Sequence, residues 1–384
     1  MRLALANLLH DRTRLAVTVA GIAFSTFLMI FQGSLLMGFL RASSRVIQSV
    51  DADLWIASHG ANSFDFATPL PANTRWMARG VGGVATVSQI VTGLGFWQRP
   101  DGSRQTVSVV GADREMGGDY PIGPDTVLLR EAALIDSSDQ KNLNVAISTL
   151  GSTLGSTSGP SSSPTPSLEI SGHRVHVERT INDFSTFLGT PYVFMTLDDA
   201  RRCLGVAKEN SMFVAIRVAP GHDIGAVRQD LQSRLPGVDV WTAAEFAFRA
   251  KRYWTLQTGA GAALVTAGML GFVVGVLVVS QTVYATTMEH IEEFATLKAL
   301  GASATQVAAM VMVQAIAGTM CGLVLGMIAA YPAMHAARPL IAWIYTPWQL
   351  TATIAVSALL MAGLASITAA RAALSVEPGR VFRA

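Results

Sequence analysis

Charge, cysteine and lysine are all scarce in this sequence, and the first two already limit the class of protein. Asp, Glu, Lys and Arg make up only 14% of the 384 residues, and the formal net charge is +2. With a mean hydropathy of +0.40, the chain is too apolar for an ordinary soluble protein, and it has no basic run for nucleic acid. The two cysteines, Cys203 and Cys321, fall in a soluble segment and in an apolar run. We therefore expect no disulfide between them.

The few lysines argue against a nucleotide site in this chain. A phosphate-binding loop places a Lys directly after a Gly, so that the side chain reaches the phosphates. The four lysines, at positions 141, 208, 251 and 298, all follow other residues. A metal site at His173, His176 and Glu178 is also disfavoured, because residues three apart in a strand point to opposite faces. The sequence thus predicts neither an enzyme nor a metalloprotein.

Four apolar runs, at 15–40, 254–288, 303–335 and 345–370, are long enough to cross a bilayer as helices. None contains Asp, Glu, Lys or Arg, which argues against an ion relay through the spans. The first run is too long for a cleaved signal peptide and is predicted to remain as an anchor. Basic residues before the first run and after the last place both termini in the cytoplasm.

The flanking segments complete this topology. Residues 1–14 predict an amphipathic helix on the cytoplasmic interface, and residues 371–384 predict a cytoplasmic tail. The second span, counted from Thr255 to Met288, would be about 51 Å long. Because the hydrocarbon core is about 30 Å thick, this helix is expected to project from the bilayer as a stalk.

Residues 41–253 have an ordinary soluble composition, which predicts a folded α+β domain outside the cytoplasm. Alternating apolar residues predict a strand at 212–218, and apolar residues at helical spacing predict a helix at 224–235. A further strand is predicted at 238–241. Another strand is expected at 192–195. Asp223, Thr196 and the Thr242/Glu245 capping box are the expected helix N-caps. The Gly- and Ser-rich stretch 151–167 predicts a flexible loop.

Two of the spans carry glycine every fourth residue. These are Gly271 and Gly275 in the second span, and Gly318, Gly322 and Gly326 in the third. Small residues at this spacing let another helix approach closely. Packing within one chain and packing across a dimer both satisfy the pattern.

The one charged segment between the second and third spans is residues 289–302. Ile291, Phe294, Leu297 and Lys298 share one face of a helix there, and Gly301 is placed to cap its C-terminus. From the pattern alone, this segment is either a surface helix that a partner displaces or an ordinary cytoplasmic loop.

The sequence from Glu293 to Ala302 (EFATLKALGA) resembles the Glu-Ile-Gly-x-x-x-Ala-x-Gly-Ala signature of MacB/FtsX-like ABC transporter permeases. Residues 50–54 (VDADL) extend the resemblance, which is strongest to the DevC-type branch. Two departures affect the docking details, because Ala295 stands where the family usually has Gly and Glu292 where a basic residue is common. The resemblance implies an α-helical four-span transmembrane domain with a large α+β extracytoplasmic domain inserted between helices 1 and 2.

The resemblance also implies partners and a role. The segment would be the coupling helix that docks on a separate ABC ATPase, through Glu289, Ile291, Glu293, Phe294, Leu297, Lys298 and Gly301. ATP and Mg would bind to that ATPase, and this chain would hold no cofactor. A second copy of the chain, a periplasmic adaptor and membrane lipid would complete the assembly in the bacterial inner membrane, without nucleic acid.

Three functions follow as alternatives. The chain is an exporter permease for a lipophilic or amphipathic substrate, or a non-transporting mechanotransmitter that regulates a periplasmic partner such as a cell-wall hydrolase. The third alternative is a membrane-anchored enzyme or sensor, which the missing catalytic motif disfavours. The resemblance favours the exporter.

Overall fold

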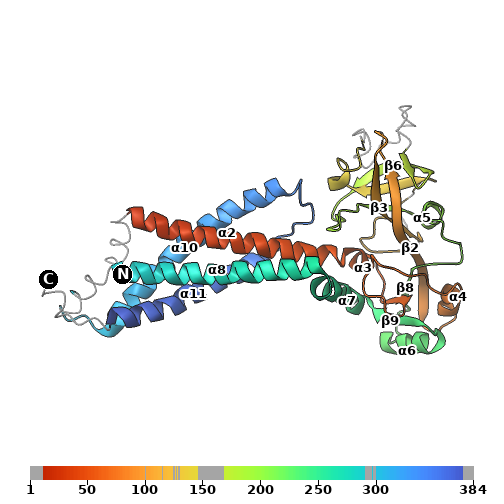
Figure 1. Cartoon of the computed structure of the whole chain (residues 1–384). Coiled ribbons are helices and arrows are strands. Elements are labelled where there is room, and N and C mark those ends of the chain that lie inside the picture. Colours follow the sequence, from red (N-terminus) through yellow and green to blue (C-terminus); the bar gives the residue numbers. More distant parts are fainter. Residues whose placement is uncertain are drawn as a thin grey trace. The chain divides into compact units, whose positions relative to one another are not determined.

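The structure, a computed structural model, describes residues 12–374 apart from 100, 115, 124, 125, 127, 129, 146–167, 290–295 and 297–299. It divides into two compact units, shown in Figure 1. The membrane unit comprises Met1–Gly38, Ala262–Leu340 and Ile344–Ala384, and the α+β unit comprises Phe39–Gly261 and Ile341–Trp343. The loop expected at 151–167 lies outside the described residues, as do residues 1–11 of the interfacial helix expected at 1–14 and residues 375–384 of the tail expected at 371–384. Residues 12–14 belong to α2, and residues 371–374 belong to α11.

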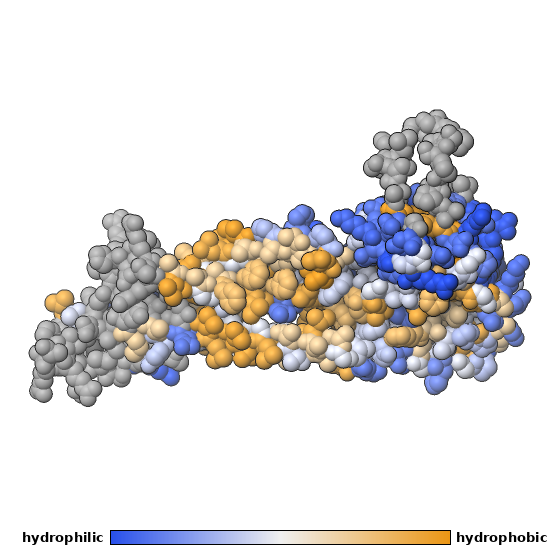
Figure 2. All heavy atoms as spheres, turned by 45° about the horizontal axis from the view of Figure 1, so that its top comes forward, coloured by the Kyte–Doolittle hydropathy of each residue, from blue (hydrophilic) through white to orange (hydrophobic). Residues whose placement is uncertain are grey.

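The membrane unit is built from four long helices: α2 (Arg12–Ala42), α8 (Gly259–Glu289), α10 (Ala304–Ala337) and α11 (Trp348–Leu374). Each contains a stretch long and apolar enough to cross a membrane. On the face shown in Figure 2, apolar side chains cover much of these helices. Ser303 opens α10 with a capping box to Gln306. The four spans expected from hydropathy are therefore confirmed.

The expected continuous helix from Thr255 is wrong at its start. Helix α7 (Ala243–Leu256) ends before Gln257 and Thr258, and α8 begins at Gly259. The Thr258 hydroxyl donates to the carbonyl of Trp254 at 2.5 Å and accepts from the amide of Gly261 at 3.2 Å, so it caps the new helix. A Cβ on Gly261 would lie 1.8 Å from the Trp254 carbonyl oxygen, so only glycine fits there. The 31 residues of α8 alone would extend for about 46 Å.

The α+β unit is organised on one nine-stranded sheet with the order β3-β7-β4-β6-β5-β2-β8-β1-β9. Its strands are β1 (Leu54–Ser58), β2 (Val84–Gln98), β3 (Arg104–Ala112), β4 (Ala132–Asp136), β5 (Leu168–Ile170), β6 (His173–Ile181), β7 (Tyr192–Thr196), β8 (Phe213–Val218) and β9 (Val238–Thr242). Its helices are α3 (Arg45–Ser49), α4 (Thr74–Arg79), α5 (Leu197–Leu204), α6 (Ile224–Arg234) and α7, with the short η1 (Ser137–Asp139).

The long strand β2 belongs to two subsheets. Its second half pairs with both β3 and β5, and this additional pairing closes β3, β7, β4, β6, β5 and β2 into a ring. Its first half pairs with β8, which leads to β1 and β9. The pairs β3–β7 and β4–β6 are parallel, whereas the other strand pairs are antiparallel. The unit is thus one ring and one open four-stranded sheet that share a strand.

The predicted strand–helix–strand segment is confirmed as β8, α6 and β9. Asp223 caps α6 by accepting from the amide of Ala226, and Thr242 and Glu245 form the expected capping box on α7. Thr196 likewise caps α5 after strand β7. Both cysteines are free, and Cys203 is buried whereas Cys321 is exposed.

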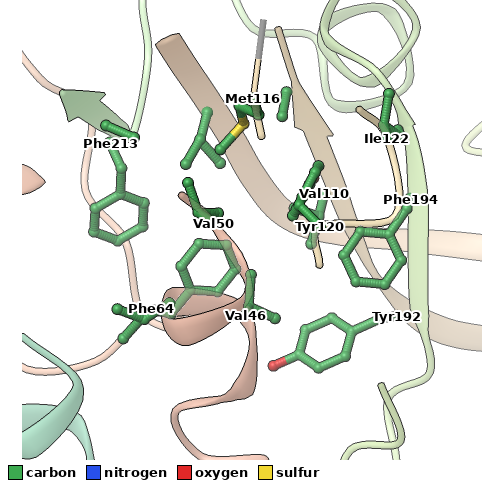
Figure 3. Packing of buried hydrophobic residues seen from close by; sticks show 14 of the residues in the cluster. Val46, Val50, Phe64, Val110, Met116, Tyr120, Ile122, Tyr192, Phe194 and Phe213 are labelled. Atoms are coloured by element: carbon green, nitrogen blue, oxygen red, sulfur yellow. The ribbon is translucent and has the colours of Figure 1, made fainter. Parts of the chain in front are cut away.

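One apolar core connects the short helices that follow span α2 and precede span α8. Val46 and Ile47 from α3 and Phe246, Ala247 and Ala250 from α7 are buried in the same cluster. Figure 3 shows Val46 and Val50 directed into this cluster among aromatic rings of the sheet. Both short helices are therefore fixed to the α+β unit by packing.

Candidate functional site

Most of the expected coupling helix lies outside the described residues. This holds for Ile291, Glu292, Glu293, Phe294, Ala295, Leu297 and Lys298, and Glu289 is the last residue of α8. Thr296 is helical, and its carbonyl accepts from the amide of Leu300 at 3.0 Å. Gly301 has a φ of +96°, which is the left-handed conformation of a helix cap. This conformation agrees with the C-cap expected at Gly301, and the docking role of the segment stays a prediction.

The glycine stripes pack against α2 of the same chain. A Cβ on Gly322 would lie 2.6 Å from Cβ of Ile22, and one on Gly326 would lie 2.6 Å from the carbonyl oxygen of Ala23. On α8, a Cβ on Gly275 would lie 2.9 Å from Sδ of Met29.

The contacts at the other two stripe glycines are looser or not described. A Cβ on Gly271 would lie 3.4 Å from Cγ of Gln32, and Gly318 is buried. Helices α8 and α10 therefore both approach α2 closely where glycine removes the side chain. The contacts described here lie within one chain, and packing across a dimer stays an alternative prediction.

Six aromatic side chains of the α+β unit form a cluster, here called the base cluster. Its members are Phe39, Phe66, Phe187, Tyr253, Trp254 and Trp343. Phe39 belongs to the end of α2, Tyr253 and Trp254 belong to the end of α7, and Trp343 lies between α10 and α11. Phe187 is central, because its ring lies 4.5 Å from that of Phe39 and 4.8 Å from that of Trp254. The cluster thus brings together residues from the end of α2, the end of α7 and the segment between α10 and α11.

A buried carboxylate lies against the base cluster. Asp65 accepts a hydrogen bond from the hydroxyl of Tyr192 at 2.5 Å and another from Nε1 of Trp254 at 3.1 Å. Burial raises the pKa of Asp65, and these two hydrogen bonds oppose the rise. Asp65 connects the loop after β1, strand β7 and the end of α7.

Two arginines, one in the last turn of α2 and one at the start of α3, pair with the same carboxylate of the α+β unit. Arg41 and Arg45 both pair with Asp183, and the Arg45 contact is 3.3 Å. The guanidinium of Arg45 also lies 5.0 Å from the ring centre of Phe184, which is a cation–π distance. These contacts add charge pairing to the apolar packing of α3.

The segment 50–54 has a structural role in the α+β unit. Asp53 accepts from the amide of Val218 at 2.8 Å, and its own backbone bonds to Ile216 and Ala243. Asp51 pairs with Arg217 at 2.7 Å. The segment therefore fixes the start of β1 against β8 and the start of α7.

The residues weighed for metal binding lie on one strand, as expected. His173 and His176 both belong to β6, and His173 is exposed. Within the described part of the chain, no group of three or more His, Cys, Asp or Glu residues could hold a metal ion.

Sequence reasoning missed the base cluster and Asp65. The available signal was the position of Phe39, Tyr253, Trp254 and Trp343 beside the ends of apolar helices, which is where membrane proteins concentrate aromatic residues. No comparable signal marks Asp65, because its loop has no periodicity.

Two family models together match the chain from the first span to the last. Residues 15–234 match the MacB-like periplasmic core domain, and residues 265–378 match the FtsX-like permease C-terminal model. The first match alone covers more than half of the 384 residues. No curated protein matches the sequence.

Solved structures give weaker likenesses. The periplasmic region of MacB from Actinobacillus actinomycetemcomitans is 8% identical with a TM-score of 0.37, over 52% of this chain and 92% of that one. The extracellular domain of the noncanonic ABC-type transporter YknZ from Gram-positive bacteria is 13% identical with a TM-score of 0.31, over 50% of this chain and 98% of that one.

Proposed function

The chain belongs to the MacB/FtsX-like ABC transporter permeases, and on that premise we propose that it is the permease subunit of an ABC exporter. It is a multi-pass inner-membrane protein with a large periplasmic domain, which is the α+β unit. Membership implies an ABC ATPase partner and dimerisation. In this proposal, ATP hydrolysis on the separate ATPase moves the periplasmic domain and exports a lipophilic or amphipathic substrate, as in the DevC-type branch.

The observation that carries the proposal is the short connection in sequence between two of the spans and helices of the periplasmic domain. Only Ser43 and Ser44 separate α2 from α3, and only Gln257 and Thr258 separate α7 from α8. Residues of α3 and α7 are buried in one apolar core of the periplasmic domain. In this proposal, a displacement of α2 or α8 is passed to that core through these short connections.

The remaining steps follow from the coupling segment. ATP and Mg bind to the partner ATPases, and closure of the ATPases moves residues 289–301 in each of two copies. Helix α8 passes the movement to α2 through the close contacts at Gly271 and Gly275. A periplasmic adaptor would receive the substrate, and membrane lipid would surround the four spans.

The experiment replaces the apolar face of the coupling segment. Burial of a side chain of this size contributes about 1.5–3 kcal/mol, so Phe294→Ala/Leu297→Ala should weaken ATPase docking by about two orders of magnitude or more. The measurements are co-purification of the ATPase and the stimulated ATP turnover. A triple Glu→Gln variant at 289, 292 and 293 should have a smaller effect that fades with salt, because exposed ion pairs contribute little.

The matched control is Phe248→Ala/Leu340→Ala, which removes the same side-chain types. Phe248 is 67% exposed and Leu340 is 89% exposed, and both are remote in sequence from residues 289–302. The proposal fails if the coupling variant binds and stimulates the ATPase as well as this control does. Stimulated turnover without substrate transport, accompanied by activation of a periplasmic hydrolase, would instead favour the mechanotransmitter.

A further inference from the structure

A cleft of about 1200 Å³ opens in the periplasmic domain beside α4, the end of β3 and both ends of α5. Six cationic side chains line it, namely Arg75, Arg114, Arg130, Arg201, Arg202 and Lys208. The carboxylates among the lining residues are only Asp113, Asp198 and Asp199. Because the whole chain has a net charge of only +2, this is a strong local concentration of positive charge.

Two guanidinium groups at the cleft share one neutral acceptor. Oε1 of Gln89 accepts from Nη1 of Arg75 at 3.0 Å and from Nη2 of Arg201 at 3.2 Å. Arg201 is only 8% exposed, and the buried Nε atoms of both arginines have no hydrogen-bond partner. Burial lowers the pKa of Arg201, and the positive charge of Arg75 adds to this, whereas the negative charges of Asp113, Asp198 and Glu209 oppose it. An anion would relieve this repulsion.

The three lining carboxylates offset part of this positive charge, and two of them also accept hydrogen bonds from other donors. Oδ2 of Asp113 accepts from the backbone amide of Gln89 at 2.8 Å, and it lies 3.7 Å from Arg75. Asp199 accepts from the hydroxyl of Thr196, from the amide of Glu131 and from Arg202. Asp198 points mostly to solvent, with its side chain 83% exposed, and lies 3.8 Å from Arg201.

At the rim, positive charge faces the solvent. Arg130 and Lys208 are exposed, and neither forms an ion pair with any residue that the structure describes. Arg114 donates to the carbonyl of Leu128 at 2.8 Å. Cations on α4, in the loop after β3 and on the turn after α5 therefore surround the cleft from different elements.

We propose that this cleft is a binding site for a phosphate-bearing ligand, either a soluble phosphorylated small molecule or a lipid headgroup. Arginines placed around a centre suit the several oxygens of a phosphate better than the planar pair of a carboxylate. The volume exceeds that of a phosphate alone, and Ala112, Leu197 and Val206 supply apolar lining for an attached group. The proposal is independent of the coupling segment, because a transport-inactive chain would still bind the ligand.

The test is calorimetric titration of the full-length protein, purified in dodecyl maltoside at constant ionic strength. The probes are inorganic phosphate, glycerol 3-phosphate, dihexanoyl phosphatidylglycerol and the dicarboxylate glutarate. Wild type should bind a phosphate probe saturably and more tightly than glutarate. Equal affinity for glycerol 3-phosphate and the short-chain lipid assigns a soluble ligand, whereas tighter binding of the lipid assigns a headgroup.

The variants separate binding from folding. The rim variant Arg130→Gln/Lys208→Gln changes exposed residues only and should weaken binding by about tenfold or more, or about 1.4 kcal/mol. The control Arg234→Gln/Arg252→Gln removes the same charge from exposed positions outside the cleft and should leave the affinity unchanged within about twofold, because salt screens remote charges. The proposal is overturned if no phosphate probe binds saturably, if glutarate binds more tightly, or if the rim variant binds as well as the control.

Discussion

Replacement of glycine by alanine at position 326 tests a close contact between α10 and α2 in the membrane unit. The added Cβ of Gly326→Ala would lie 2.6 Å from the carbonyl oxygen of Ala23 and 2.7 Å from Cβ of Thr26. Carbon atoms pack optimally at about 3.5–4.0 Å, so α2 and α10 must separate by about 1 Å. The Ala23 oxygen belongs to the helix backbone, which cannot turn aside as a flexible side chain does.

Two effects of opposite sign set the magnitude. Overpacking of a well-filled contact typically costs about 1–3 kcal/mol. Alanine is favoured over glycine inside a helix by about 0.8–1.0 kcal/mol. The net loss for Gly326→Ala is therefore about 0–2 kcal/mol of unfolding free energy, and Gly322→Ala should behave similarly, because its Cβ would lie 2.6 Å from Cβ of Ile22.

Gly363 supplies the matched control. It lies within α11, and a Cβ there would meet nothing within 4 Å. Gly363→Ala should therefore gain helix propensity without overpacking and stabilise the protein by up to about 1 kcal/mol. The difference between the changes in unfolding free energy of Gly326→Ala and Gly363→Ala cancels the helix-propensity contribution. What remains is the cost of overpacking, about 1–3 kcal/mol.

The assay is equilibrium unfolding by SDS titration in mixed micelles, with the dimer measured separately. Because α2 of the same chain already fills the contacts at Gly322 and Gly326, dimer dissociation should not change. Equal effects of Gly326→Ala and Gly363→Ala on unfolding would refute the close contact. A weakened dimer with unchanged unfolding would show that the stripe packs between subunits.

The parts of the fold that depend on local signals could be predicted from the sequence. An apolar run of 20 or more residues indicates a span without any knowledge of its neighbours. Capping residues act within one turn, which is why Thr196, Asp223 and Thr242 were identified correctly as N-caps. The break between α7 and α8 was missed because hydropathy is continuous across it, although Gly259 and Gly261 are weak helix formers.

The ring of strands could not be predicted, because its pairs are distant in sequence. Ser108 of β3 lies opposite Tyr192 of β7, and Ala132 of β4 lies opposite His176 of β6. All five residues of β4 are buried, so the alternation that reveals a half-exposed strand is absent. The candidate site was missed for the same reason, since Asp65 meets Tyr192 and Trp254 only after the sheet has formed.

Three further predictions concern nucleotide, topology and the buried carboxylate. The purified chain alone should bind no ATP in a filter-binding assay, because none of its lysines follows a glycine as a phosphate-binding loop requires. Stoichiometric binding would contradict this reasoning. In a background without Cys203 and Cys321, a membrane-impermeant thiol reagent should label Ser158→Cys in intact spheroplasts, whereas labelling only after permeabilisation would reverse the topology. Asp65→Asn should alter the pH dependence of unfolding. Burial raises the pKa of Asp65 in the folded protein above its usual value of 3.8, so the native state binds this proton more tightly than the unfolded state does. The contribution to stability is therefore complete below about pH 3.8 and is lost as the pH rises through the folded pKa. The Asn side chain stays neutral and can still accept from Trp254 while donating to Tyr192, so the variant should gain stability relative to wild type as the pH rises. If the unfolding free energies of Asp65→Asn and wild type changed in parallel with pH across that range, deprotonation of Asp65 would not destabilise the folded protein, and the prediction would be wrong.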